Sequence, residues 1–471
     1  MVFQEAIRNS IFHEISNYCS ANNIESFVVG GFVRDFLLER PSKDIDILII
    51  GDGISVAKQI AKQIDPKISV TIFKNFGTAY FKLNDYEIEF VGSRKESYAS
   101  DSRNPIIETG SFKDDINRRD FKINSIAISL NNQNFGQLID LHDGLTDIKQ
   151  KVINTPLDSN ITFSDDPLRM LRGIRFACQL DFEIHDDLVK TMTKQKNRIS
   201  IVTNERIVDE INKIILSETP SKGFKILEQT GILEIIMPEL TSLKGIDEIE
   251  GQKHKDNFYH TLEVLDNICL NTDNLWLRWA ALLHDIGKVP TKTFNKKIGW
   301  TFHGHEFEGS KMVYKLFKRL KMPLNEKMKY VQKLVLMSSR PIVLAQENVT
   351  DSAVRRLIFD AGDSVDDLMT LCEADITTKN ENKFKKYHDN FKIVREKIKT
   401  VEEKDSIRNF QPPISGAEIM STFNLKPCKT IGIIKEAIKE AILEGIIANN
   451  YEEAYKLMLE EGGKLGLSHG K

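Results

Sequence analysis

Two aspartates stand one residue apart in an otherwise apolar run of the chain. Asp44 and Asp46 lie in "KDIDILII", which has the composition of a buried β-strand. Alternate side chains of a strand share a face, so both carboxylates point one way and the isoleucines between and after them point the other way. Two carboxylates at one dry spot would repel each other unless a divalent cation lay between them. Because Mg²⁺ prefers hard oxygen ligands, the pair predicts a magnesium site.

A double glycine and an arginine precede this strand. Gly30 and Gly31 end the run "FVVGG", and Arg34 follows in the first turn of a helical segment. A glycine turn before a helix lets backbone N–H groups approach phosphate oxygens, and a guanidinium adds a charge-assisted contact. Each feature alone is common in turns and solvated strands. Their combination predicts a site for a nucleoside triphosphate and its metals, with in-line displacement at phosphorus.

The elements that must position these residues change along the chain. From residue 27 to about 130, short β-rich runs alternate with two helical segments, which predicts a mixed sheet. Beyond that region the apolar residues recur with a helical period. We therefore expect an α+β protein in four parts, a mixed-sheet head followed by three all-α parts: 1–140, 141–255, 256–385 and 386–471.

Composition limits the classes of protein that the chain can represent. Its 471 residues allow two to four domains, and a net charge of −3 confines any nucleic-acid contact to a local patch. Five cysteines without a CxxC pair suit a reducing compartment and argue against a zinc ribbon. The amino-terminal residues indicate an amphipathic helix rather than a signal peptide, and no apolar run is long enough to span a membrane. We expect a soluble, cytoplasmic protein.

A pair of opposite charges in "SDDPLRMLRGIRF" is suited to base recognition. Asp166 and Arg169 are three residues apart, so on a helix they are neighbours. The carboxylate offers acceptors and the guanidinium offers donors. Cytosine and adenine each present an amine donor beside a ring-nitrogen acceptor, so the pair fits both. Uracil and guanine would leave mispaired groups, at a cost of about 1–3 kcal/mol each.

A simpler interpretation of the same segment stays open. Ser164, Asp165 and Asp166 before Pro167 also form an ordinary helix start, in which one aspartate caps the helix while the other reads the base. Arg172 and Arg175 continue the face of Arg169. They either hold phosphate or stack on the base, or they form a solvated arginine stripe.

The segment "VVGGFVRDFLLERPSKDIDILI" resembles the signature of the class II nucleotidyltransferases of the polymerase-β superfamily, which includes CCA-adding tRNA nucleotidyltransferases and bacterial poly(A) polymerases. Three later segments resemble further motifs of that family, in family order: "INRRDFKINSIAI" its RRDFxxN motif, "LIDLHDGLTDI" its Asp-x-x-Asp-Gly turn and "DDPLRMLRGIRFA" its nucleotide-selecting motif. Asp165 stands where that last motif more often has glutamate, a conservative departure.

This resemblance implies a polymerase-β-like nucleotidyltransferase head, a helical neck and body, and a carboxyl-terminal tRNA-binding tail. It implies that Asp44 and Asp46 are catalytic and hold Mg²⁺. It also implies triphosphate contacts from four residues: Arg34, Arg118, Arg119 and Asn124. Glu89 stands where a third carboxylate could lie, or it is a solvated strand residue.

Histidines and carboxylates gather between residues 256 and 385. Nitrogen and oxygen ligands from separate helices suit Mn, Fe, Ni, Zn or Mg and can activate water for phosphoester hydrolysis. The segment "LLHDIGK" and the order of the set resemble the HD phosphohydrolase superfamily. This resemblance implies a second divalent metal, of open identity, and "HEFEG" favours His305 over His303 as a further ligand. The implied ligands are His260, His284, Asp285, His305 and Asp375.

The resemblance to the class II nucleotidyltransferases implies an enzyme that adds CCA to the 3′ end of tRNA without a template, takes CTP and ATP, and releases pyrophosphate. A poly(A) polymerase and a split CC-adding or A-adding enzyme share its motifs. "FKNFGTAYFKL" lacks the basic run that poly(A) polymerases usually carry nearby. An alternative from another class is an HD-domain metal-dependent phosphohydrolase that acts on RNA ends or nucleotides.

Overall fold

The computed structural model describes residues 5–74, 77–97, 106–249, 251–346, 350–405, 408 and 411–468. The chain divides into two compact units, Met1–Pro238 and Glu239–Lys471. The unit boundary lies inside the expected 141–255 part, and the division into four parts stays a prediction. Within the described ranges, no helix is both long and apolar enough to cross a membrane.

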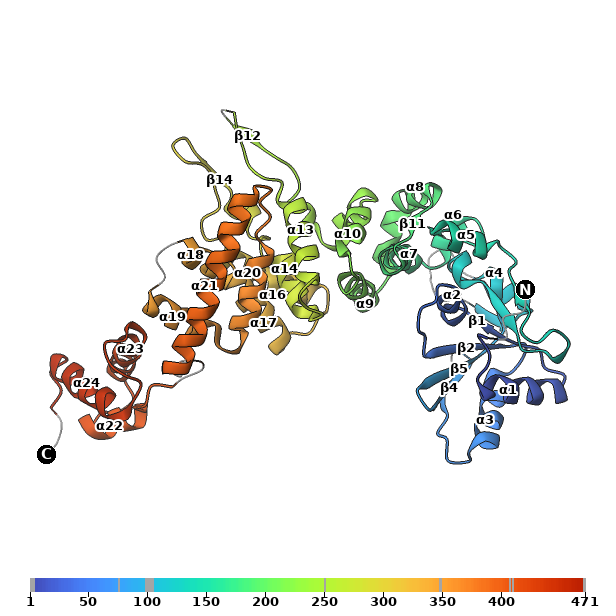
Figure 1. Cartoon of the computed structure of the whole chain (residues 1–471), viewed down its shortest axis with the longest axis horizontal. Coiled ribbons are helices and arrows are strands. Elements are labelled where there is room, and N and C mark those ends of the chain that lie inside the picture. The colour runs from blue at the N-terminus through green and yellow to red at the C-terminus, as the bar shows by residue number, and fades with distance from the viewer. Residues whose placement is uncertain are drawn as a thin grey trace. The chain divides into compact units, whose positions relative to one another are not determined.

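A mixed sheet of seven strands forms the core of the first unit (Figure 1). The strand order is β3-β4-β5-β2-β1-β8-β9, and only the β2–β5 pair is parallel. This arrangement confirms the expected mixed sheet. The strands are β1 Ser26–Val29, β2 Asp44–Ile49, β3 Thr71–Phe73, β4 Thr78–Leu83, β5 Tyr86–Gly92, β8 Ala127–Ser129 and β9 Leu138–Ile139.

The two faces of the sheet have different surroundings. Ile45, Ile47 and Ile49 of β2 are fully buried in the main core, together with apolar residues of helices α1 (Ser10–Ala21) and α3 (Gly53–Ile64). The alternation of β2 therefore turns Asp44 and Asp46 away from this core, as the sequence predicts. On the carboxylate side of the sheet, Leu48 belongs to a smaller apolar cluster.

Helices α2 (Gly31–Leu37) and α4 (Phe112–Asn117) lie between sheet strands in the sequence: α2 follows β1, and α4 precedes β8. The predicted change to helices after it is confirmed, although β10 (Val152–Ile153) and β11 (Glu183–Ile184) form a short parallel pair among them. A separate hairpin pairs β6 (Arg94–Ser97) with β7 (Ile106–Thr109). The remaining helices of the first unit are α5 Gly144–Gln150, α6 Ser159–Asp165, α7 Leu168–Leu180, α8 Asp186–Gln195, α9 Asn204–Ile215, α10 Pro220–Gln229 and α11 Ile232–Ile236, and α12 Pro238–Thr241 spans the boundary.

Over its described residues, the second unit is helical apart from two hairpins, β12–β13 (Glu248–Ile249, Gln252–Lys253) and β14–β15 (Thr293–Asn295, Gly299–Thr301), which Figure 1 shows projecting from the helices. Its helices are α13 Asn257–Cys269, α14 Leu275–Leu283, α15 Lys288–Thr291, α16 His305–Arg319, α17 Glu326–Met337, α18 Arg340–Gln346, α19 Asp351–Ala361, α20 Val365–Ala374, α21 Glu381–Asp405, α22 Gly416–Phe423, α23 Lys429–Glu444 and α24 Tyr451–Lys464.

Candidate functional sites

A cavity of about 640 Å³ opens on the carboxylate face of the sheet in the first unit. Its walls come from β2, β4, β5, α2, α7 and the segment around residue 120. Acidic and basic side chains both line it, and we call these two groups the acidic wall and the basic wall. The acidic ones include Asp44, Asp46, Glu87 and Glu89, and the basic ones are Arg34, Arg119, Arg172 and Arg175.

Strand pairing sets the acidic wall. In the parallel β2–β5 ladder Asp46 is the partner of Glu89, and Asp44 is the partner of Glu87. Burial raises the pKa of Asp46 to about 6; Arg119 opposes this rise, while Glu89 and Asp44 add to it. Close, buried carboxylates resist full ionisation, and a bound divalent cation offsets the cost of ionising them. The donor set therefore fits a hard cation at this wall.

Gly30 brings the backbone against the acidic wall. Its φ is +77°, and a Cβ built on it would lie 2.8 Å from Oδ2 of Asp46 and 3.3 Å from Nη1 of Arg119. Any larger residue would be strained and would displace the carboxylate. Gly30 and Gly31 both line the cavity at the start of α2, where the sequence predicts a phosphate cradle.

A hydrogen-bonded chain connects the basic wall. Nη1 of Arg34 donates to Oδ1 of Asn124 over 2.8 Å, and Nδ2 of Asn124 donates to Oδ1 of Asp120 over 3.0 Å. Nε of Arg172 donates to Oδ2 of Asp120 over 2.7 Å. Burial alone would raise the pKa of Asp120, but Arg172 and Asn124 outweigh it and hold this pKa at about 2. Asp120 is therefore a buried anion that orients Arg172 directly and Arg34 through Asn124.

Phe176 of α7 is surrounded by guanidinium groups. The Cζ atoms of Arg175, Arg34 and Arg172 lie 4.3, 5.0 and 5.5 Å from its ring centroid. Nε of Arg175 also lies 3.2 Å from Oε2 of Glu210. An aromatic face attracts cations. The ring of Phe176, together with the carboxylates of Asp120 and Glu210, therefore holds the three arginines close to one another. Arg172 and Arg175 are thus packed into the site rather than forming a solvated stripe.

The remaining predicted residues of this unit lie in different places. Arg119 lines the cavity and pairs with Asp115 over 3.0 Å. Nε of Arg118 donates to the same aspartate over 2.9 Å, and the carbonyl of Arg118 accepts from Nη2 of Arg169 over 2.8 Å. Among the described residues, the lining does not include Arg118, Asp166 or Arg169.

The prediction that Asp166 shares a helix with Arg169 is wrong. Asp166 is extended, with φ −136° and ψ 102°, in the break between α6 and α7. Pro167 causes this break, because the residue before a proline is disfavoured in helical conformation. Oδ1 of Asp166 accepts from the backbone N–H of Leu168 over 3.1 Å, as in the alternative in which an aspartate caps the helix. Its Oδ2 lies 3.4 Å from Nη2 of Arg206.

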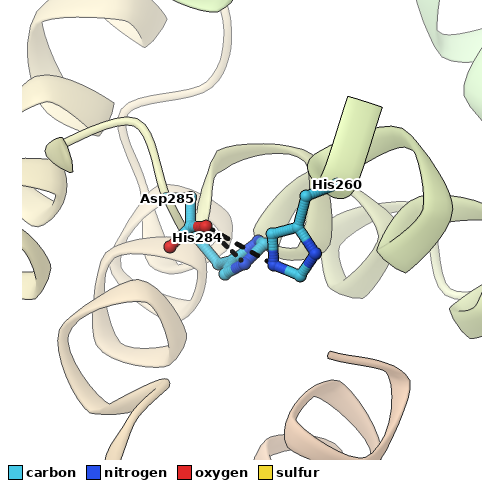
Figure 2. Close-up of side chains that lie close together, drawn as sticks. All are labelled: His260, His284 and Asp285. Carbon is cyan, nitrogen blue, oxygen red and sulfur yellow. Dashed lines mark ion pairs between the residues drawn. The ribbon is translucent and has the colours of Figure 1, made fainter. Parts of the chain in front are cut away.

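Helix ends bring the predicted histidine and aspartate set together in the second unit. His260 comes from α13, His284 and Asp285 follow α14, and Asp375 follows α20. Nε2 of His260 lies 2.8 Å from Oδ1 of Asp375, and Nε2 of His284 lies 3.3 Å from Oδ2 of Asp285. Figure 2 shows His260, His284 and Asp285 converging, with ligand atoms within 4.8 Å of one another.

Two of these histidines have one nitrogen fixed by the backbone. Nδ1 of His284 lies 2.8 Å from the carbonyl of Ala281, and Nδ1 of His305 lies 2.9 Å from the carbonyl of Phe302. A proton on each Nδ1 leaves Nε2 as a lone-pair donor, the arrangement found at metal-ligating histidines. Within the described residues, the buried Nε2 of His284 has no hydrogen-bond partner. Nε2 of His305 lies 3.7 Å from Oδ1 of Asp285, so His305 joins the set.

The charges around His284 also fit a cation. Burial would lower the pKa of His284, but Asp285 and Asp375 raise it to about 10. The two aspartates have lowered pKa values despite their burial, because the histidines face them. Buried carboxylates that hold a proton on a neighbouring imidazole would accept a divalent metal in its place.

Three family models match the chain: the Poly A polymerase head domain over residues 26–154, the probable RNA and SrmB-binding site of polymerase A over 181–244, and the HD domain over 257–375. The multifunctional CCA protein of Mannheimia succiniciproducens is 31% identical, over 64% of this chain and 71% of that protein. The chain belongs to the tRNA nucleotidyltransferase/poly(A) polymerase family.

Other relatives of this chain carry related names. The A-adding tRNA nucleotidyltransferase of Aquifex aeolicus is 29% identical over 70% of this chain, which spans 42% of that relative's length. A solved CCA-adding enzyme in an apo form matches 97% of this chain and 93% of its own, with a TM-score of 0.64 and 23% identity. The Thermotoga maritima CCA-adding enzyme complexed with tRNA matches 99% of each chain, with a TM-score of 0.61 and 21% identity. These structures show that the chain shares their fold.

Several residues that line the cavity are absent from the sequence prediction, Asp120 and Phe176 among them. Asp120 stands inside the RRDF motif, so its position next to Arg118 and Arg119 was a usable signal. Phe176 carries no such signal, because an aromatic residue on the apolar face of a helix is an ordinary core residue. Glu89, predicted only as one of two alternatives, lines the cavity beside Asp46.

Proposed function

We propose that this nucleotidyltransferase adds CMP, CMP and AMP to the 3′ end of tRNA, using CTP and ATP and releasing pyrophosphate. The observation that carries the proposal is the cavity in which Asp44, Asp46 and Glu89 face Gly30 and four arginines. The kinship to a multifunctional CCA protein supports tRNA as the acceptor. The A-adding relatives make an enzyme that adds only part of CCA the nearest alternative.

The acidic wall is the proposed metal site. Asp44, Asp46 and Glu89 would hold divalent cations, with Mg²⁺ the candidate that matches an all-oxygen donor set. Bound there, such cations supply Lewis-acid stabilisation of the charge that develops at phosphorus. The elevated pKa of Asp46, about 6, supports this assignment because it reflects burial first and the neighbouring carboxylates Glu89 and Asp44 second.

The basic wall is the proposed triphosphate site. Gly30 and Gly31 let the chain approach the phosphates, and Arg34, Arg119 and Arg172 supply guanidinium donors for their oxygens. Preformed donors cost little reorganisation during the reaction. Asp120 and Asn124 act as positioning residues, because they hold Arg34 and Arg172 by hydrogen bonds.

Base choice is the part of the proposal that depends on Asp166 and Arg169. Oδ1 of Asp166 is committed to the backbone of Leu168, whereas Oδ2 faces Arg206 and is the acceptor that a base amine would meet. Arg169 would supply the donor for the ring nitrogen. If so, replacing Arg169 with alanine will change the CTP to UTP preference more than the affinity for triphosphate.

The direct test offers tRNA transcripts that lack CCA, with CTP and ATP singly and together, and measures product length. Full extension requires both nucleotides if CCA is added. Asp46→Ala will abolish incorporation of both nucleotides, and Asp85→Ala, which removes a carboxylate that is 86% exposed, will leave it intact. Incorporation of either nucleotide by Asp46→Ala would contradict the metal assignment.

We propose metal-dependent phosphoester hydrolysis as a second candidate function, in the second unit. The observation that favours it is the convergence of His260, His284, Asp285, His305 and Asp375. A cavity of about 570 Å³ includes His260 and Asp375, with Lys255 and Lys379 in its lining. Hydrolysis of bis(p-nitrophenyl) phosphate with Mn²⁺, Ni²⁺, Zn²⁺ or Mg²⁺ tests it. Metal-stimulated turnover that Asp285→Ala removes is expected, and turnover unchanged by that substitution would rule the site out.

A further inference from the structure

An aromatic pair extends the acidic wall of the cavity in the first unit. In the sheet, Asp46 of β2 is the register partner of Glu89 of β5, and Glu89 is the register partner of Tyr80 of β4. Register partners share a face of the sheet, so these three side chains form one row. Phe73 of β3 stacks on Tyr80, with ring centroids 6.1 Å apart and an interplanar angle of 12°. Both rings line the cavity that contains the carboxylates.

The exposure of Phe73 requires a reason. Its side chain is 44% exposed, although it faces a cavity lined mainly by polar groups. Lone exposed apolar residues are ordinary on protein surfaces, but a stacked pair of nearly parallel rings in a polar cavity presents a flat aromatic face to it. Such a surface suits a planar ligand, and a nucleobase stacks on it whatever its identity.

The order of the strands separates the two sides of the acidic wall. In the sequence β4-β5-β2-β1, the Gly30–Gly31 turn follows β1, whereas the aromatic pair lies beyond β5. The proposed triphosphate site is therefore on one side of Asp46 and the rings are on the other. In nucleotidyl transfer the attacking and leaving oxygens are roughly in line at phosphorus, so the attacking hydroxyl approaches from the side opposite pyrophosphate.

We propose that Phe73 and Tyr80 form the stacking surface for the 3′-terminal base of the RNA acceptor. This inference rests on the proposed nucleotidyl transfer and names the residues that hold the other substrate. The 3′-terminal base changes after each addition, so a contact that reads no hydrogen bonds serves every step. The two rings position the acceptor, and the carboxylates beside them mark where its terminal hydroxyl is needed.

The first test measures binding without catalysis. An acceptor RNA with 2-aminopurine as its 3′-terminal base is titrated with the full-length protein in the absence of nucleotide. Stacking on the wild-type protein will quench the fluorescence, and Phe73→Ala and Tyr80→Ala will each relieve the quenching. Tyr80→Phe keeps the ring and will quench like wild type. Leu157→Ala, which removes an apolar side chain that is 43% exposed elsewhere in this unit, will have no effect.

The second test separates the two substrates. Phe73→Ala and Tyr80→Ala are expected to raise KM for the acceptor about tenfold, the scale of one lost base stack, with an unchanged Kd for CTP. Unrelieved quenching together with an unchanged acceptor KM would overturn the inference, as would a weakened CTP affinity with an unchanged acceptor KM. Thermal unfolding checks that each variant folds, and Phe73→Leu provides a smaller change if Phe73→Ala does not.

Failure of the proposed function has a different signature. A wild-type protein that quenches 2-aminopurine but extends no RNA would refute nucleotidyl transfer and leave the stacking surface standing. A wild-type protein that extends RNA but gives no quenching would refute only the stacking surface.

Discussion

At the scale of single residues, the buried carboxylate of Asp120 connects several side chains of the carboxylate cavity by hydrogen bonds. It accepts from Asn124 over 3.0 Å and from Arg172 over 2.7 Å, and Asn124 in turn accepts from Arg34. A buried anion is stable only when its charge is balanced, and here Arg172 provides the balance. The same interaction prevents Arg172 from turning away from the cavity.

We predict that Asp120→Asn lowers the free energy of unfolding in a pH-dependent way. The pKa of Asp120 is lowered from its ordinary 3.8 to about 2 in the folded protein, so its ionised form stabilises the fold above pH 4. That contribution, about 2 kcal/mol, is lost as the pH falls from 4 to 2. Urea unfolding of wild type and variant will differ by a constant amount above pH 4, and the difference will shrink below it. A difference independent of pH would contradict the ion pair, and Asp85→Asn is the exposed control.

We predict that Gly30→Ala lowers the rate of nucleotide addition more than tenfold while the protein still folds. The new Cβ would lie 2.8 Å from Oδ2 of Asp46 and would push the carboxylate out of place. Gly251→Ala is the matched control, because Gly251 has a φ of +76° but nothing within 4 Å of its Cβ position. Steady-state addition of CMP measures both. Equal losses in the two variants would mean that backbone strain, and not contact with Asp46, matters.

At the scale of elements, the parallel pairing of β2 with β5 builds the acidic wall. The two strands are joined through α3, β3 and β4, and their register places Glu89 beside Asp46. In the second unit, the ends of α13, α14 and α20 perform a similar task for His260, Asp285 and Asp375. Both sites use side chains at strand positions or helix ends, where the backbone holds them rigidly.

We predict that Glu89→Gln weakens divalent-metal dependence without unfolding the head. Glutamine keeps the size of the side chain but removes one of the charges that raise the pKa of Asp46. The Mg²⁺ concentration for half-maximal CMP addition will rise, because one anionic oxygen ligand is lost. Glu87→Gln, on the next cavity-facing position of β5, is the comparison. An unchanged Mg²⁺ requirement in Glu89→Gln would assign Glu89 to a solvated strand position.

At the scale of the whole molecule, the two candidate sites belong to different compact units. The carboxylate cavity lies within Met1–Pro238 and the histidine set lies within Glu239–Lys471. Described residues of one unit do not enter the lining of the other unit's cavity. Two chemistries with separate metal ligands can therefore be removed one at a time.

We predict that the two sites fail independently. Asp285→Ala will remove the rise in thermal unfolding temperature that Mn²⁺ or Ni²⁺ gives the second unit, because a ligand that binds only the folded state stabilises it. The same variant will keep CMP and AMP addition. Asp46→Ala will lose addition and keep the metal-dependent rise. Loss of both properties in either variant, with the fold intact, would show that the sites are coupled.

Local sequence patterns were sufficient to predict much of the secondary structure and the facing of several site residues. The alternation of "DIDILII" already places Asp44 and Asp46 on one face, because the side-chain period of a strand is a local property. The helical periodicity of α7 was equally accessible. The position of Asp166 was missed although the signal was local, since Pro167 disfavours helix at the residue before it.

Other features were decided only by tertiary structure, because they depend on contacts between distant parts of the chain. Asp120 meets Arg172 across 52 residues, and no period in the sequence relates them. Glu89 joins Asp46 through the register of two strands separated by more than thirty residues, so its role depends on which strands pair. Phe73 and Tyr80 look like ordinary strand residues until the sheet places their rings on the carboxylate side. The sequence by itself determined which groups can do chemistry; pairing and packing decided which of them meet.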